Sequence, residues 1–106
     1  MREARASATI FAALGDETRL RLVARLSGAG PLSITSLTAG TRMTRQAITK
    51  HLHVMQAAGL VRSTRNGRRC LWQLEQRRVH EARQYLEVIS QQWDDAIGRL
   101  RKFVEE

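Results

Sequence analysis

The segment Thr44–Val61, TRQAITKHLHVMQAAGLV, gathers side chains that could bind a metal ion, a phosphate group or a nucleic-acid base. His51 and His53 suggest a metal site at first. On a helix, however, two residues at this spacing point about 200° apart, and a helical ligand pair needs a spacing of three or four residues. His51 lies beside the apolar side of the segment, so we expect a structural, hydrogen-bonded histidine there. The histidine pair therefore predicts no metal site.

The polar face of the same segment has the chemistry of base recognition. Glutamine can form two hydrogen bonds to adenine, arginine and lysine bind guanine, and threonine can contact the methyl group of thymine. The side chains on this face are Arg45, Gln46, Thr49, Lys50 and His53. A solvated helix face is the alternative, and for His53 solvent exposure and contact with DNA remain equally open. The opposite stripe predicts burial at Ile48, Leu52 and Met55.

The positive charge of the chain is concentrated in its middle. The net charge is +8, yet no acidic residue occurs between Glu17 and Glu75, an interval with ten basic residues, while each flank sums to −1. A basic middle with neutral flanks predicts a polyanionic partner. Nucleic acid is the first candidate. A membrane surface is less favoured, because the interval has no basic amphipathic helix with a large apolar face.

Composition limits the remaining possibilities. A chain of 106 residues with 42% apolar and 26% charged residues fits one globular domain, residues 1–106. The single cysteine, Cys70, excludes an intramolecular disulfide and suits a reducing compartment. No signal peptide or membrane span is apparent, so we expect a cytoplasmic location. No catalytic triad, carboxylate pair or phosphate-binding glycine loop occurs, and neither an enzyme nor a cofactor is predicted.

Apolar spacing predicts four helices before a change of period. An N-terminal helix covers residues 4–14, and Asp16 caps a second helix. The second helix should turn Leu20, Val23, Ala24 and Leu26 inward and Arg19, Arg21 and Arg25 outward. A short helix capped by Ser33 and a longer helix capped by Thr44 follow, separated by a turn. Residues 33–58 therefore have the pattern of a helix-turn-helix.

Residues 60–74 alternate with a period of two around Asn66-Gly67, which predicts a β-hairpin. A two-residue turn at this dipeptide would pair Arg65 with Arg68 and Val61 with Trp72. Cys70 would then point into the packed face, where an inert thiol is favoured over a redox sensor. The arginines at the hairpin tip are expected to contact phosphate or the minor groove: Arg65, Arg68 and Arg69.

Residues 78–104 predict one long helix with an unbroken apolar seam. The seam residues alternate spacings of four and three, as in a coiled coil: Ala82, Leu86, Ile89, Trp93, Ala96, Leu100 and Phe103. A helix of this length extends about 40 Å, more than the rest of the domain can cover. We therefore expect a second subunit on the seam, together with Phe11 of the N-terminal helix. For Trp93, lining a ligand cavity between subunits is the alternative.

Two stretches resemble the ArsR/SmtB family of bacterial repressors: FAALGDETRLRLVARL and TRQAITKHLHVMQAAGLVRSTRNGRRCLWQL. The resemblance covers roughly residues 8–74. It implies a mostly α fold with a small β-hairpin, a winged helix-turn-helix whose N- and C-terminal helices form a dimer interface. Glu17 replaces the proline usual in the family, and an acid suits that position at the start of a helix.

The metal ligands of the founding members have no counterpart in this chain. The helix before the recognition helix is SITSLTAG, without Cys, His, Asp or Glu, and the long helix offers His80, Glu81, Asp94 and Asp95 without a second histidine. The chain therefore resembles the metal-free branch of the family. No effector is predicted, and a small ligand, a partner protein or no inducer at all remain open.

Together these observations predict a homodimeric repressor that binds an inverted-repeat operator in double-stranded DNA. The expected DNA contacts are Arg42, Thr44, Arg45, Gln46, Thr49, Lys50, His53, Arg65, Arg68 and Arg69. The weaker phosphate candidates are Arg19, Arg21 and Arg42. The expected dimer contacts are Phe11, Ala82, Leu86, Ile89, Trp93, Ala96, Leu100 and Phe103. The alternatives are a nonspecific, architectural nucleic-acid-binding protein and a module whose winged helix binds an acidic protein.

Overall fold

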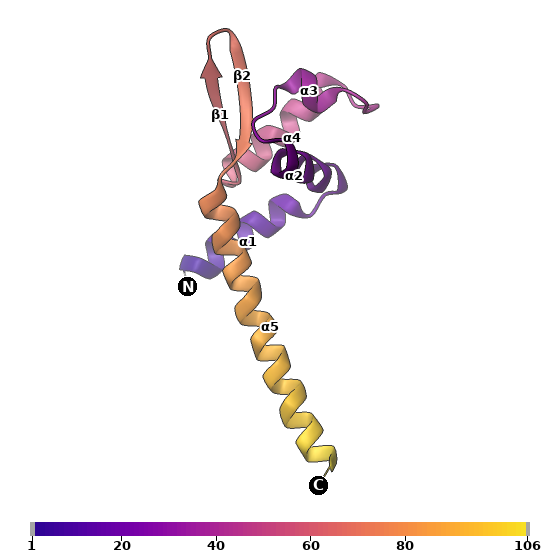
Figure 1. The fold of residues 1–106 in the computed structure, drawn as a ribbon, viewed down its shortest axis with the longest axis vertical. Helices are drawn as coiled ribbons and strands as arrows, with labels where there is room; N and C mark the ends of the chain where they lie inside the picture. Colours follow the sequence, from indigo (N-terminus) through magenta and orange to yellow (C-terminus); the bar gives the residue numbers. More distant parts are fainter. Residues whose placement is uncertain (1, 106) are drawn as a thin grey trace.

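The computed structural model describes residues 2–105 of the chain and the side chains of residues 4–105. Residues 1 and 106 of the predicted domain lie outside this range. The structure is mostly helical with one antiparallel hairpin, as predicted (Figure 1). In chain order the elements are α1 (Arg2–Leu14), α2 (Glu17–Ala29), α3 (Ile34–Thr38), α4 (Arg45–Ala57), β1 (Val61–Asn66), β2 (Arg69–Leu74) and α5 (Gln76–Glu105).

Side-chain caps begin three of the helices at the predicted residues. The carboxylate of Asp16 accepts the backbone N–H of Arg19 at 3.1 Å. The hydroxyl oxygens of Ser33 and Thr44 each accept a backbone N–H three residues later, also at 3.1 Å. Each cap satisfies a backbone donor that has no partner inside its helix. The start of α4 is thereby determined locally, by the Thr44 cap.

The core lies between α2, α3, α4 and the base of the hairpin. The predicted stripe Ile48, Leu52 and Met55 is buried, at 0–1% exposure. From α2, Leu22 and Leu26 are buried, whereas Leu20 is 52% exposed and Ala24 is also exposed. The predicted inward face of α2 was therefore wrong in part. The buried leucines lie four residues apart, one above the other on the helix, and this rotates Leu20 and Ala24 toward solvent.

Arg19 and Arg25 also depart from the prediction that they point outward. The Nε–H of Arg19 donates to the carbonyl of Ala13, and its Nη1 lies 3.3 Å from Nδ1 of His51. Arg25 donates from its two terminal nitrogens to the carbonyls of Leu37 and Ser36, each at 2.7 Å. These carbonyls belong to the C-terminal ends of α1 and α3, where helices carry unpaired acceptors and negative partial charge. Two arginines of α2 thus connect the neighbouring helices.

The hairpin register differs by two residues from the prediction. Val61 pairs with Leu74, Arg65 with Cys70, and Asn66 with Arg69, so the turn consists of Gly67 and Arg68. A turn over Asn66-Gly67 would need positive φ at both residues, but Gly67, with φ 65°, is the only hairpin residue in that region. A type II′ turn places glycine first, which explains the shift. Because the shift is even, each side chain stays on its predicted face.

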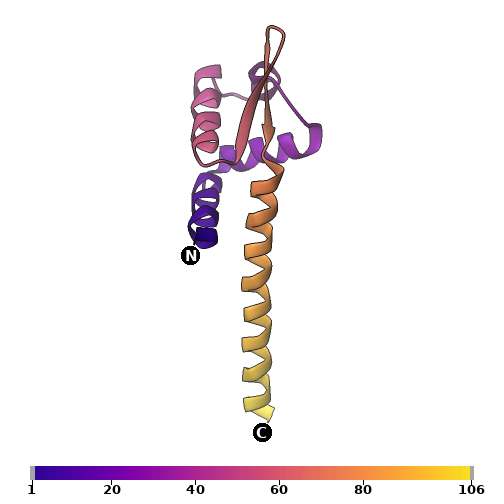
Figure 2. The same cartoon turned by 90° about the vertical axis from the view of Figure 1, so that its left-hand side faces the viewer.

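Cys70 is exposed, contrary to the prediction that it packs inward. The buried face of the hairpin ends at Trp72 and Leu74, and the strands then continue past the helices toward the tip (Figure 2). The backbones of Trp72 and Leu32 exchange two hydrogen bonds, at 2.8 and 2.9 Å, which join the hairpin to the segment before α3. Cys70 lies beyond this junction, toward the tip, and its side chain is exposed.

The long helix α5 extends beyond the rest of the chain (Figure 1). Near its start, Ala82 is buried, and the rings of Tyr85 and Phe11 lie 6.4 Å apart between α5 and α1. Farther along, Trp93 is 65% exposed and Phe103 81% exposed. Within one chain, most of the apolar seam therefore faces solvent.

The Asp16 cap gives a testable pH dependence. The hydrogen bond from the backbone N–H of Arg19 lowers the pKa of the Asp16 carboxyl below 3.8. A lowered folded pKa adds stability above 3.8 that disappears as pH falls through the folded pKa. We expect Asp16→Asn, which keeps the cap, to be less stable than the native chain at pH 7. Urea unfolding at several pH values should show this difference shrinking at acid pH. A difference independent of pH would contradict the assignment.

Candidate nucleic-acid interface

The outer face of α4 is a shallow groove of polar and basic side chains. It is lined by Thr44, Arg45, Gln46, Ala47, Thr49 and Lys50. Arg45, Gln46 and Lys50 are exposed. Within residues 4–105, their side chains have no hydrogen-bond or ion-pair partner. Because the opposite face of the helix is buried, the core holds these groups outward and leaves them available to a ligand.

The two threonines of this face are partly committed to the helix. The hydroxyl oxygen of Thr44 accepts the N–H of Ala47, so its first role is the cap. The hydroxyl of Thr49 donates to the carbonyl of Arg45 at 2.7 Å. With the hydroxyl proton engaged, Thr49 presents its methyl group, which suits contact with thymine better than hydrogen bonding to a base.

The histidines of α4 have separate surroundings. Nδ1 of His51 lies 3.9 Å from the carboxylate of Asp16, in addition to its contact with Arg19, in agreement with the predicted structural role. His53 is exposed, and its ring centre lies 6.0 Å from that of Trp72. It therefore stands where α4 meets the hairpin, beside the groove rather than inside it. Its contact with DNA stays a prediction.

The hairpin carries a second concentration of positive charge. Arg65, Arg68 and Arg69 are exposed around the turn at the tip, and no acid among the described residues pairs with them. Arg62, at the base, differs because its Nε lies 2.9 Å from the carboxylate of Glu75. Among the hairpin arginines that the structure describes, those at the tip have no acidic partner, and their mutual repulsion favours a bound anion.

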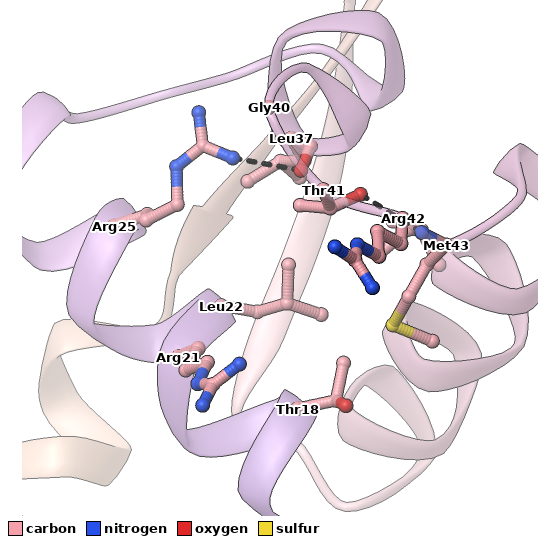
Figure 3. A pocket seen from close by; sticks show the side chains of 10 residues that line it. Thr18, Arg21, Leu22, Arg25, Leu37, Gly40, Thr41, Arg42 and Met43 are labelled. Atoms are coloured by element: carbon pink, nitrogen blue, oxygen red, sulfur yellow. Dashed lines mark hydrogen bonds between the residues drawn. The ribbon is translucent and has the colours of Figure 1, made fainter.

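Arg42 lies outside the α4 groove, in a separate hollow beside Arg21 of α2 (Figure 3). The sequence indicated both Arg21 and Arg42 as weaker phosphate candidates, without predicting that they line one hollow. The two residues belong to different elements, and no sequence spacing predicts that such residues lie close together. Their proximity is therefore seen only in the folded structure. The weaker candidate Arg19 is half-buried, and its guanidinium group already contacts the carbonyl of Ala13 and the ring of His51.

In residues 2–105 no cluster of three or more Cys, His, Asp or Glu side chains could hold a metal ion. No helix in the same range is long and apolar enough to cross a membrane. The candidate binding groups on the described surface are therefore basic side chains without a partner.

Comparison with known proteins agrees with this geometry. Residues 14–64 match a helix-turn-helix domain family. The uncharacterized HTH-type transcriptional regulator YuzN of Bacillus subtilis (strain 168) is 45% identical over a 65-residue alignment that covers 56% of this chain and 71% of YuzN.

Two solved structures extend the likeness. An ArsR-like transcriptional regulator from Rhodococcus sp. RHA1 is 33% identical with a TM-score of 0.83, and the match covers 97% of this chain and 96% of that one. A homodimeric winged helix-turn-helix DNA-binding domain from Mycobacterium bovis, 20% identical, shares the fold with a TM-score of 0.66 over 83% of this chain and 81% of that one. By sequence and by fold, this chain belongs to the ArsR family of winged helix-turn-helix transcriptional regulators.

Proposed function

We propose that the chain is a sequence-specific, homodimeric repressor that binds an inverted-repeat operator and does not respond to metal. The observation that carries this proposal is α4, whose one face is buried while Arg45, Gln46 and Lys50 project from the other, with no side-chain partner among the described residues. A helix held in this way can enter the major groove and contact base edges near its N-terminus. The tip arginines would contact phosphate, which positions the protein without selecting sequence.

Dimerisation is supported by the exposed seam of α5. A surface helix with this many large exposed apolar residues is costly in water unless another surface covers it. A second copy of α5, with α1 beside it, would cover the seam from Leu86 to Phe103. The relative from Mycobacterium bovis is homodimeric, which supports the same assembly. Two recognition helices about 34 Å apart would then match half-sites separated by one helical turn.

Independence from metal is supported by the donor chemistry of two helices. Residues 33–40, which include α3, contain no thiolate, imidazole or carboxylate. In α5, His80 is the only histidine, and Asp94 and Asp95 follow several turns later. Tetrahedral metal sites need three or four such donors at one place.

Selection of bound fragments from the source genome tests the proposal, with the DNA upstream of the chain's own operon as the first target. A repressor should prefer its operator over unrelated DNA by roughly 10³ or more. Equal binding to all fragments would indicate a nonspecific, architectural protein. Absence of DNA binding at physiological salt would indicate a module for an acidic protein partner.

Gln46 should determine preference at one operator position. Replacing Gln46 with Ala removes a side chain able to form two hydrogen bonds to adenine, and should cost about 1–3 kcal/mol on the operator. Binding to operators varied at each position should show relaxed preference at one base pair. An equal loss on every sequence would contradict the assignment.

Arg68 should act on all DNA alike. Arg68→Ala should weaken binding to operator and unrelated DNA equally, and reduce the slope of log K against log salt by about one. Arg62→Ala is the matched control, because Arg62 lies on the same hairpin and is paired with Glu75. If both variants change the slope equally, the tip has no special role.

Trp93 should be essential for dimerisation. Trp93→Glu places a charge in the centre of the seam, where burial of an unpaired carboxylate is strongly unfavourable, and we expect monomers in sizing chromatography with light scattering. Val88→Glu is the control, since Val88 is exposed to a similar degree but lies off the seam. A dimer that persists in Trp93→Glu would place the interface elsewhere.

A further inference from the structure

A hollow of about 540 Å³ lies between α2 and the turn that precedes α4 (Figure 3). Its lining brings together two segments about twenty residues apart in the sequence: Thr18, Arg21, Leu22 and Arg25 from α2, and Gly40, Thr41, Arg42 and Met43 from the turn, with Leu37 and Ile48 behind them. Figure 3 shows the guanidinium groups of Arg21 and Arg42 directed into the hollow on either side of Leu22.

The arginines of this hollow differ in how far they are already committed. Arg25 is committed to the carbonyls of Leu37 and Ser36. Arg42 is exposed and has no hydrogen-bond or ion-pair partner in the described part of the chain. Arg21 pairs with Glu17 at 2.6 Å, one turn earlier on α2, and both side chains are more than three-quarters exposed. Exposed pairs of this kind are weak, so a stronger anion can replace Glu17.

We propose that this hollow binds one phosphate group of the DNA backbone, between Arg21 and Arg42, and that Glu17 competes with the phosphate for Arg21. Thr18 adds a hydroxyl group on the same lining, whereas the hydroxyl of Thr41 already donates to the carbonyl of Thr38 at 2.7 Å. A phosphate accepts several charge-assisted hydrogen bonds at once, which suits two guanidinium groups better than one carboxylate does. Glu17 then lowers affinity for all DNA and keeps binding dependent on the contacts of α4.

The position of the hollow favours DNA as the source of the phosphate. Arg42 and Met43 directly precede the Thr44 cap, so the hollow adjoins the end of α4 that enters the major groove in the proposed function. A strand at the edge of that groove would pass over the turn. The inference rests on the proposed function, and it adds a contact from α2, which lies outside the helix-turn-helix itself.

The test measures DNA affinity at several salt concentrations for Arg21→Ala, Glu17→Gln and the double variant. Arg21→Ala should reduce the salt slope by about one and weaken binding roughly five-fold at 0.15 M salt, on operator and unrelated DNA alike. Glu17→Gln should tighten binding about two- to five-fold, since it frees Arg21 and removes a negative charge. In the double variant most of this gain should disappear.

The matched controls are Arg83→Ala and Glu87→Gln, because this exposed pair on α5 has the same spacing of four residues. They should leave DNA affinity nearly unchanged, and circular dichroism should show that all variants are folded. Native-like affinity of Arg21→Ala, or a Glu17→Gln gain of equal size with and without Arg21, would overturn the inference. A native chain that binds no DNA would contradict the proposed function itself. A native chain that binds DNA, with Arg21→Ala binding equally well, would contradict only the phosphate site.

A free anion is the other source of the same chemistry. Titration of inorganic phosphate into the DNA-free protein, followed by amide NMR shifts of Thr18, Thr41 and Met43, tests it. We expect weak shifts that Arg21→Ala abolishes. Tight phosphate binding together with unchanged DNA affinity in Arg21→Ala would assign the hollow to a small anion and overturn the DNA assignment.

Discussion

Burial of one face of α4 is the constraint on which the rest of the structure depends. Ile48, Leu52 and Met55 are removed from water against α2 and α3, and this determines which side chains remain outside. The arginines of α2 reinforce the arrangement, because Arg19 contacts both the end of α1 and His51 on α4. A helix anchored in this way holds its outer face rigidly, and that rigidity makes recognition of base edges geometrically feasible.

Electrostatics gives the molecule its second constraint. Most arginines of the acid-free interval have no side-chain partner in the described part of the chain, and folding separates those that hold the structure from those that face outward. Arg25 closes the end of α3, and Arg62 pairs with Glu75. The tip of the hairpin and the turn before α4 keep unpaired guanidinium groups. A polyanion would relieve the repulsion among them, so the same charges that destabilise the free chain favour its complex.

The long helix poses the opposite problem, since its seam lacks an apolar partner rather than a charged one. Near its start α5 contacts α1 through the rings of Tyr85 and Phe11, and Ala82 is buried there. Beyond them the seam extends into solvent (Figure 2). A second subunit would bury the seam and set the distance between two recognition helices. In the proposed repressor, the apolar seam of α5 therefore determines both dimer assembly and the spacing of the operator half-sites.

Local signals in the sequence determined the helices, their caps and the two faces of α4, because capping, periodicity and side-chain type act over a few residues. The same signals identified the basic tip of the hairpin, though not its register, which depended on the backbone energy of Gly67 and Arg68. Tertiary structure alone decided that Leu20 is exposed, that Arg19 and Arg25 bond to neighbouring helices, and that Arg21 and Arg42 line one hollow. Each of these depends on how whole helices pack, and packing joins residues that no short-range pattern connects.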